Sequence, residues 1–371
     1  MLNMISENIK TKNVVITGIA GMVGSHLTDY LLKNTDWKIY GFCRWNDSLE
    51  NIEHLSDHIN TGTRLELIYG DLNDLSSLIN LVEKSKPDYV FHLAAQSYPQ
   101  TSFDAPFETL ETNIIGTAKL LESIHKSIYD PVIHVCASSE VFGRVPQESL
   151  PINEECKFHP ASPYAISKVG TDLIGRYYAE AYGMTIMTTR MFTHTGPRRG
   201  DVFAESTFAK QIAMIEAGLI EPELHVGNLD SLRTWSDVRD AVRAYHLLVT
   251  KDPIAGEYYN IGGSYSCTVK DMLDYLVSQS TTKDIKIETD PSRLRPIDAD
   301  LQVPDTTKFK KHKIDHSVEF RKRQIERNMP LIIKNAVYKY MNEEYKKNCD
   351  LYLKNYEKQK LNLMFKLAKV M

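Results

Sequence analysis

The sequence predicts an α/β protein: a doubly wound parallel sheet with a smaller, interleaved C-terminal α/β domain. Three observations support this fold class. The chain opens with a short apolar run, three closely spaced glycines and a helical pattern. Short β-branched runs then alternate with helical stretches, the pattern of repeated strand–helix units in a parallel sheet covered on both faces. Beyond residue 192 the alternation loosens, which indicates a second unit.

The opening segment predicts a dinucleotide site. An apolar strand pattern at 14–16 leads into Gly18, Gly21 and Gly24, and an apolar stripe of helical period follows at 23–31. Glycines between a strand and a helix let the backbone turn sharply and approach a pyrophosphate, which the N–H groups of the helix N-terminus then face. A glycine-rich turn without a ligand is the alternative, and the strand and helix on either side argue against it.

The other elements follow in order along the chain. Further strands are predicted at 38–42, 64–69, 89–93, 132–137 and 185–191, with helices between them, notably at 75–84 and 110–125. Beyond these we expect helices at 206–217, 237–250 and 268–278, and strands at 224–226, 258–261 and 285–288, with 258–261 able to return to the main sheet. Such Rossmann-type sheets bind ligands at the carboxyl ends of their strands, so chemistry is expected in the loops that follow them.

The same pattern predicts four parts. We expect a loose tail at 1–12, a dinucleotide-binding domain at 13–193 plus 236–262, a substrate domain at 194–235 plus 263–345, and a helical extension at 346–371. The last 41 residues contain nine lysines and four acidic residues. A solvated amphipathic helix packed on the body is the expectation for them, and contact with a partner or an acidic surface is the alternative.

Composition narrows the class of protein. The 371 residues are 42% hydrophobic and 25% charged, and a net charge of -4 gives no bias toward nucleic acid or membrane. The five cysteines show neither CxxC nor other paired ligand spacing, so we expect isolated thiols in a reducing compartment and no metal site. No basic-then-apolar leader and no apolar run near ~18 residues is found, so a cytoplasmic protein is expected.

A second motif predicts catalytic chemistry. Tyr164 and Lys168 stand four residues apart in a helical pattern, which places them on one side of a helix. The lysine ammonium is expected to favour the phenolate and lower the pKa of Tyr164 from its usual ~10, making it a base near neutral pH. Ser138 follows the fifth strand pattern, ahead of Ser139 and Glu140. Its hydroxyl can bind the substrate oxygen that Tyr164 deprotonates.

Together these motifs resemble the extended short-chain dehydrogenase/reductase family over roughly residues 13–345. Segments 70–72 and 93–96 and Asn113 add to the resemblance, which implies that Asp71 and Leu72 hold an adenine. The full set of cofactor contacts that we expect comes from the glycine turn, the strand ends and the catalytic helix: Gly18, Gly21, Met22, Val23, Gly24, Arg44, Asp71, Leu72, Leu93, Ala94, Ala95, Gln96, Asn113, Tyr164 and Lys168.

Within that family the chain most resembles the GDP-mannose 4,6-dehydratase branch. Segment 41–55 is similar to its basic cofactor loop, 197–200 to its substrate loop, and 226–235 to its diphosphate-binding strand, with Arg233 as the anion partner. A planar guanidinium fork suits phosphate oxygens. The resemblance implies substrate contacts from Ser97, Ser139, Thr193, Arg198, Lys210, Val226, Asn228, Arg233 and Arg295.

The resemblance implies a reaction on a GDP-hexose or GDP-heptose. Tyr164 would take the C4 hydroxyl proton as C4 is oxidised, Glu140 would take the C5 proton, and water would leave from C6. NADP is the expected cofactor, because the second strand ends without the acid that binds a ribose 2′-hydroxyl in NAD-selective folds. Asp47 is the first acid after that strand, whereas Arg44 can meet a 2′-phosphate.

Some positions depart from the branch and keep other functions open. Ser138 stands where the branch has Thr, and Thr193 where it has Asn. Segments 96–98 and 194–197 are closer to GDP-4-keto-6-deoxymannose reductases. A 4-keto-sugar reductase or a 4-dehydrogenase with net redox change is therefore the alternative. A cofactor-binding regulator without catalysis is a further one, against which the intact Ser138, Tyr164 and Lys168 argue.

Surplus apolar side chains predict a homo-oligomer. The helix after Tyr164 and the stretch 110–125 each need one apolar face against the sheet, yet the former has further apolar residues: Ile166, Val169, Leu173, Ile174 and Tyr177. A helix-to-helix contact between two copies explains this surplus. We therefore expect a homodimer, and the branch resemblance implies a homotetramer through the 44–55 loop.

Overall fold

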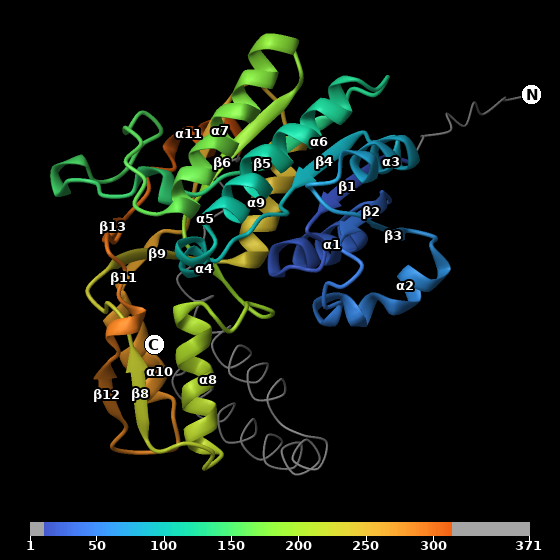
Figure 1. Cartoon of the computed structure of the whole chain (residues 1–371). Helices are drawn as coiled ribbons and strands as arrows, with labels where there is room; N and C mark the ends of the chain where they lie inside the picture. The colour runs from blue at the N-terminus through green and yellow to red at the C-terminus, as the bar shows by residue number, and fades with distance from the viewer. Residues whose placement is uncertain (1–10, 314–371) are drawn as a thin grey trace, which may run out of the picture.

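The computed structural model describes residues 11–313, and its centre is a seven-stranded parallel sheet in the order β10-β6-β5-β4-β1-β2-β3 (Figure 1). The strands are β1 (Asn13–Thr17), β2 (Lys38–Cys43), β3 (Leu65–Tyr69), β4 (Tyr89–His92), β5 (Val132–Cys136), β6 (Ile186–Met191) and β10 (Tyr258–Ile261). The strand order reverses at β1, which lies between β2 and β4. The predicted doubly wound sheet is confirmed, including the return of 258–261 to its edge.

Helices cover both faces of this sheet because successive strand residues point to opposite sides. Val14 and Ile16 belong to one apolar core and Val15 to the other. An apolar core on each face explains why strands such as β1 and β4 are nearly continuous apolar runs. The first core is covered by α1 (Met22–Asn34) and α9 (Val238–Thr250), the second by α3 (Leu75–Ser85), α6 (Gly116–His125) and α7 (Pro163–Tyr182).

A second unit begins after β6. Its own apolar core includes Phe208, Leu224 and Leu273. Figure 1 shows this unit below the main sheet, with the chain passing back through β9 directly into α9. It contains the helices α8 (Ala204–Glu216) and α10 (Val269–Ser278), the sheet β11-β9-β13 with β7 beside β9, and the pair β12-β8; the strands are β7 (His194–Thr195), β8 (Glu223–Val226), β9 (Leu232–Asp237), β11 (Tyr265–Thr268), β12 (Lys286–Thr289) and β13 (Leu301–Gln302).

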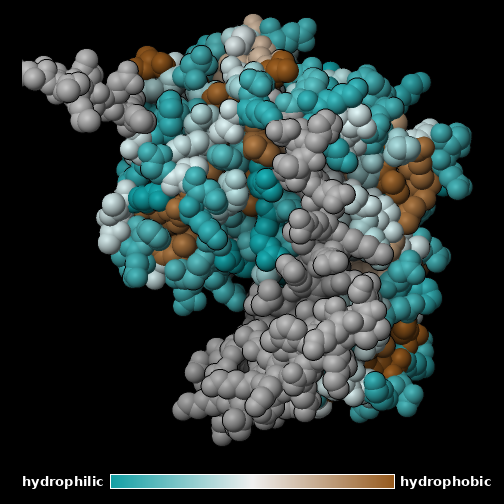
Figure 2. Space-filling view, turned by 180° about the vertical axis from the view of Figure 1, so that it is seen from behind, coloured by the Kyte–Doolittle hydropathy of each residue, from teal (hydrophilic) through white to brown (hydrophobic). Residues whose placement is uncertain are grey.

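Short elements connect these layers. They are the helices α2 (Ser56–Thr61), α4 (Pro99–Asp104), α5 (Pro106–Leu110) and α11 (Thr307–Lys313), with 3₁₀ turns at Glu50–Leu55, Ser139–Phe142, Gln147–Ser149 and Pro291–Arg293. On the face drawn in Figure 2, apolar side chains lie in separate patches among hydrophilic ones. Within residues 11–313 there is no helix whose length and apolar character would let it cross a bilayer.

The helix predicted at 110–125 is interrupted. Residues Glu111–Ile115 form a π-helical turn between α5 and α6. The carbonyl of Asn113 accepts hydrogen bonds from the hydroxyls of Thr117 (2.6 Å) and Thr171 (2.9 Å). Such turns often mark functional sites, and this one turns the Asn113 side chain inward. The strands β7, β9, β11 and β13 and the short helices are further elements that the periodicity did not predict.

Several predictions fall outside the described residues. These are most of the tail at 1–12, the end of the substrate domain beyond 313, the lysine-rich stretch 331–371 and the extension 346–371. The cysteines that the structure describes, at 43, 136, 156 and 267, are free thiols.

Candidate active site

A cavity of about 990 Å³ opens between the carboxyl ends of the sheet strands and the second unit. Its walls include the glycine turn after β1, the segments after β4, β5 and β6, and residues of β9. Predicted site residues among its lining are Gly18, Gly21, Met22, Val23, Gly24, Leu93, Ala95, Ser97, Ser138, Ser139, Glu140, Tyr164, Lys168, Thr193, Arg198, Asn228, Arg233 and Arg295. The tertiary structure thus brings together most of the residues that the sequence suggested.

The glycine turn has the shape that a pyrophosphate requires. Gly18 has a φ of +72°, and a Cβ there would lie 2.9 Å from the backbone of Ala94. A Cβ on Gly24 would lie 2.3 Å from the carbonyl oxygen of Gly18. Gly21 precedes α1, and within residues 11–313 no side-chain hydrogen bond caps the start of this helix. The N–H groups of its first turn are available to an anion, so the turn fits a dinucleotide.

Ser138, Tyr164 and Lys168 meet at the end of β5. Ser162 starts α7 by accepting a hydrogen bond from Ala165 N at 3.0 Å, which places Tyr164 in the first turn and Lys168 one turn later. The Tyr164 hydroxyl is hydrogen-bonded to Ser138. The Lys168 ammonium donates to the carbonyl oxygen of Cys136 at 2.9 Å. The predicted grouping of these three side chains is therefore present.

The expected effect of Lys168 on Tyr164 is wrong for the protein by itself. Burial raises the pKa of Tyr164 above its usual value, and the hydrogen bond from Ser138 only partly offsets this effect. The Lys168 ammonium is directed at Cys136 and lies 5.9 Å from the centre of the Tyr164 ring. Burial also lowers the pKa of Lys168. Helical spacing placed the two side chains on one side, but desolvation decides the proton affinity of the phenol.

Glu140 lies in a cluster of opposite charges. Ser138 accepts a hydrogen bond from Glu140 N at 3.2 Å and starts the 3₁₀ turn that holds this carboxylate. Arg233 Nη1 on β9 lies 3.1 Å from Glu140 Oε1, and Arg295 Nη1 lies 3.8 Å from Glu140 Oε2. Asp298 Oδ1 lies 3.5 Å from Arg233 and 3.8 Å from Arg295. The expected proton acceptor and the expected diphosphate arginines are thus in direct contact.

Other predicted cofactor residues support the cavity without lining it. Asn113 is buried; its amide donates to Gln96 O at 2.9 Å and accepts from Gln96 N at 2.8 Å. The same amide donates to Ser167 of α7 at 2.8 Å. Asn113 therefore holds the loop after β4 against the catalytic helix. Leu72 is buried in the core, and Asp71, Ala94 and Arg44 also lie outside the lining.

Three predicted substrate residues have other partners. Lys210 forms an ion pair with Asp201 at 3.1 Å, and Val226 is fully buried in the core of the second unit. Arg198 Nη1 lies 2.8 Å from Asp29 of α1. Neither Lys210 nor Val226 lines the cavity, because α8 and β8 turn these side chains to a neighbouring loop and to the core.

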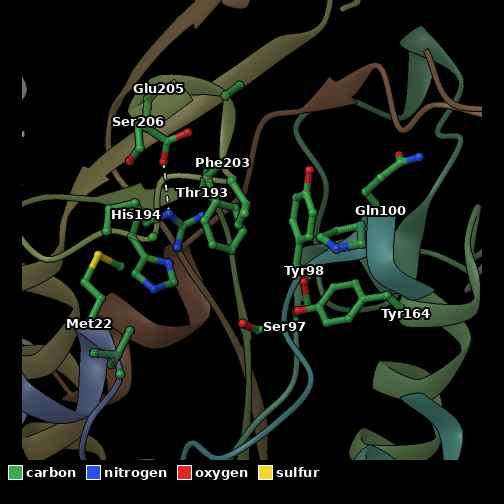
Figure 3. A pocket seen from close by; sticks show the side chains of 18 of the residues that line it. Met22, Ser97, Tyr98, Gln100, Tyr164, Thr193, His194, Phe203, Glu205 and Ser206 are labelled. Carbon is green, nitrogen blue, oxygen red and sulfur yellow. Dashed lines mark hydrogen bonds and ion pairs between the residues drawn. The ribbon is translucent and has the colours of Figure 1, made fainter. Parts of the chain in front are cut away.

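Several residues of the cavity lie outside the predicted set of contacts. His194, Arg199, Phe203 and Tyr98 line the cavity, and Figure 3 shows His194 and Phe203 on the wall opposite Tyr164. The Arg199 guanidinium lies 3.5 Å from the centre of the Phe203 ring and donates to Glu205 at 3.1 Å. The rings of Phe203 and Tyr98 meet edge to face at 5.6 Å. Segments 96–98, 194–197 and 197–200 of the sequence contain Tyr98, His194 and Arg199, whereas no motif pointed to Phe203.

His194 is a half-buried, neutral side chain. Burial, followed by the charge of Arg199, lowers the pKa of His194 to about 4. Its Nδ1 lies 3.2 Å from the carbonyl oxygen of Phe192, so this nitrogen is the donor of the neutral ring. Among the described residues Nε2 has no hydrogen-bond partner. The ring therefore presents an acceptor at the cavity wall.

A family model described as GDP-mannose 4,6 dehydratase matches residues 15–329. The chain belongs to this family. One relative, the GDP-mannose 4,6-dehydratase of Yersinia enterocolitica, is 31% identical over 334 residues, which cover 81% of this chain and 88% of the relative. The GDP-6-deoxy-D-mannose reductase of Pseudomonas aeruginosa is also 31% identical, over 287 residues, which cover 77% of this chain and 85% of the reductase.

A solved structure similar to this member of the dehydratase family is that of RMD from Pseudomonas aeruginosa complexed with NADPH. It has a TM-score of 0.73 and 26% identity, and the match covers 89% of this chain and 100% of that chain. The resemblance to extended short-chain dehydrogenases/reductases and to the GDP-mannose 4,6-dehydratase branch is confirmed by these matches.

Proposed function

We propose that the protein is an NADP-dependent GDP-sugar 4,6-dehydratase that converts GDP-mannose, or a related GDP-sugar such as a GDP-heptose, to the 4-keto-6-deoxy sugar. Membership of the family supports this activity. The observation that carries the proposal is the position of Glu140, which lines the same cavity as Ser138, Tyr164 and Lys168. Dehydration needs a proton acceptor for C5 in addition to the groups that oxidise C4.

NADP is the proposed cofactor, held by the glycine turn, the segment after β4, Tyr164 and Lys168. When bound, it supplies the hydride acceptor for C4, the hydride donor for C6 and a positive charge that favours the phenolate. The similar structure of RMD from Pseudomonas aeruginosa complexed with NADPH supports this choice. Arg44 follows β2 and is half exposed, next to Asp47 at 2.9 Å, so its guanidinium can turn to a 2′-phosphate. Tighter binding of NAD(H) than of NADP(H) would contradict this assignment.

The side chains of the cavity can perform the proton transfers. Ser138 donates a hydrogen bond to the C4 oxygen, and Tyr164 takes the C4 hydroxyl proton as C4 is oxidised. The resulting ketone acidifies the C5 hydrogen, which Glu140 takes as a general base. Glu140 then gives this proton to the hydroxyl that leaves C6, so water is lost. Once C6 has received the hydride, C5 takes up a proton, which balances the C4 hydroxyl proton held by Tyr164. Arg233 and Arg295 are proposed to hold the diphosphate.

Two substitutions test these roles. Glu140→Gln should still permit oxidation at C4 and trap reduced cofactor, seen as near-ultraviolet absorbance, while water loss falls by about 10²–10⁴-fold, the usual contribution of a positioned acid or base. Tyr164→Phe should give no reduced cofactor, because the base of the first step is missing. Loss of one water from GDP-mannose is measured by mass spectrometry.

If Glu140→Gln has the same turnover as the wild-type protein, the Glu140 carboxylate is structural and takes no proton. This result would favour the second candidate function, a GDP-4-keto-6-deoxy-sugar reductase or a GDP-sugar 4-dehydrogenase. The equal identity to the Pseudomonas aeruginosa reductase supports that alternative, as do segments 96–98 and 194–197. Stoichiometric consumption of added NADPH identifies a reductase, whereas a dehydratase regenerates its cofactor.

We propose that α7 forms a homodimer interface. Ile166, Leu173 and Tyr177 on this helix are 48%, 47% and 56% exposed, far more than apolar side chains of a covered helix. Leu173→Glu should give a monomer by light scattering, whereas a Leu173→Glu protein that stays dimeric would contradict an α7 interface. A tetramer through the 44–55 loop is proposed in addition, where Trp45 is 84% exposed.

The division of labour between segments is proposed as well. Residues 13–193 plus 236–262 bind the cofactor, and 194–235 plus 263–345 bind the nucleotide sugar, because the expected arginines Arg233 and Arg295 lie in the latter. Free thiols at Cys43, Cys136, Cys156 and Cys267 support a cytoplasmic location.

A further inference from the structure

The charges around Glu140 are balanced without any ligand. Two guanidinium groups, of Arg233 and Arg295, face two carboxylates, of Glu140 and Asp298, and all four side chains are between 13% and 25% exposed. A diphosphate between the arginines would add negative charge to a part-buried cluster that is already neutral. Part-buried charges that lose their counter-ions are costly, so at least one carboxylate must give up its arginine contacts when the diphosphate binds.

The two carboxylates are held very differently. Asp298 accepts hydrogen bonds from the Asn228 amide at 3.0 Å, from Ala299 N at 3.0 Å and from the Ser231 hydroxyl at 3.5 Å. Despite its burial, the charges of Arg295 and Arg233 and the bond from Asn228 lower the pKa of Asp298, so it stays ionised. Asp298 therefore has partners that remain in place when an arginine turns away.

Glu140 depends on the arginines. The partners recorded for its carboxylate in the described part of the chain are Arg233 at 3.1 Å and Arg295 at 3.8 Å. Its position in a short 3₁₀ turn fixes the backbone but leaves the side-chain torsions to choose another direction. Of the two acids, Glu140 is the one that an incoming anion can displace at the lower cost.

We propose, on the basis of the proposed function, that the substrate diphosphate takes the place of Glu140 on Arg233 and Arg295 and thereby releases this carboxylate into the sugar pocket. Asp298 stays and keeps the two arginines oriented toward the phosphates. The exchange involves no covalent change: two ion pairs of Glu140 break, and the phosphate oxygens form new ones. Binding energy from the nucleotide end, remote from the reacting carbons, thus prepares the proton acceptor.

This exchange has a geometric consequence for the base. While the ion pairs are present, Glu140 Oε1 lies against Arg233 and Oε2 lies against Arg295. Both carboxylate oxygens must leave these contacts before one of them can reach the C5 hydrogen. When a GDP-sugar binds, its diphosphate therefore frees Glu140 to act on the sugar. A sugar without a diphosphate leaves Glu140 in its ion pairs with Arg233 and Arg295. The diphosphate acts as a condition for C5 deprotonation as well as an anchor.

The test measures binding and needs no turnover. GDP is titrated by calorimetry into the NADP-saturated wild-type protein and into Glu140→Gln. Removing the competing carboxylate should tighten GDP binding by roughly 3- to 10-fold, the scale of a part-buried ion pair. Glu223→Gln is the matched control: it removes an equal charge from β8 of the second unit, where the carboxylate pairs with Lys286 outside the cavity lining, and should leave GDP affinity within twofold.

Three results would overturn the proposal. GDP affinity that is unchanged or weaker in Glu140→Gln shows that the carboxylate does not compete. Equal tightening in Glu223→Gln shows a general charge effect. A crystal structure of the unaltered protein with GDP in which Glu140 stays within 4 Å of Arg233 shows that no exchange occurs, and this measurement needs no variant. Failure of the wild-type protein to bind GDP at all would instead contradict the proposed function itself.

Discussion

Gly24→Ala should damage the cofactor site through the backbone alone. Gly24 lies in the first turn of α1, where an added Cβ would stand 2.3 Å from Gly18 O and 2.7 Å from Ile19 Cα. Real Cβ atoms stay beyond about 3 Å from such atoms, and both neighbours are backbone atoms that cannot rotate away. The strand–turn–helix segment must therefore open by about an ångström, which displaces the N–H groups that face the pyrophosphate.

The expected magnitude follows from overpacking. An extra methyl in a close-packed segment costs about 1–3 kcal/mol. At about 2–4 °C per kcal/mol for a domain of this order of size, the melting temperature should fall by roughly 2–12 °C. If a similar free energy is lost from cofactor binding, NADPH affinity falls about 5- to 150-fold, since 1.4 kcal/mol corresponds to tenfold.

Thermal denaturation and a fluorescence titration with NADPH measure these two effects. Gly200→Ala is the matched control, because Gly200 also lines the cavity but a Cβ there would meet the Phe203 ring at 3.6 Å and Val202 Cγ2 at 3.9 Å, both ordinary contacts. Both quantities should stay near the wild-type values in this control. A Gly24→Ala protein with unchanged melting temperature and unchanged NADPH affinity would refute the reasoning.

Two more predictions concern stability. Four largely buried histidines have their pKa lowered to about 3 or about 4 in the folded protein. In the unfolded chain their pKa is ~6.5, so the unfolded chain takes up protons first as the pH falls. The stability that these neutral histidines contribute is therefore fully present above pH ~6.5 and falls by about 2 kcal/mol per histidine at pH 5. A melting temperature that does not change between pH 7 and pH 5 would contradict this prediction. Asn113→Ala removes the partners of both Gln96 N and Gln96 O. The free energy of unfolding, measured by chemical denaturation, should fall by about 2–5 kcal/mol, and NADPH should bind more weakly. A fall of less than about 1 kcal/mol would contradict the support role of Asn113. The histidines are His26, His92, His134 and His194.

The sequence by itself determined the sheet, the nucleotide turn and the catalytic pair. Strand and helix periods are local properties, so the seven parallel strands were predictable to within a residue or two at their ends. Gly18 and Gly24 are required by backbone conformation and close approach within one strand–turn–helix segment. Tyr164 and Lys168 share a helix face because four residues make about one turn.

The tertiary structure decided the partners and proton affinities of these groups. Glu140 and Arg233, 93 residues apart in the chain, form an ion pair, and Arg198 of the cavity lining pairs with Asp29 of α1. The pKa of Tyr164 is raised and not lowered, because burial outweighs its neighbours. The π-helical turn at Glu111–Ile115 also depends on tertiary contacts, since the Asn113 side chain turns inward and bonds to Gln96 in the loop after β4. Periodicity describes neighbours along the chain, whereas charge pairing and desolvation depend on neighbours in space, which only the folded chain provides.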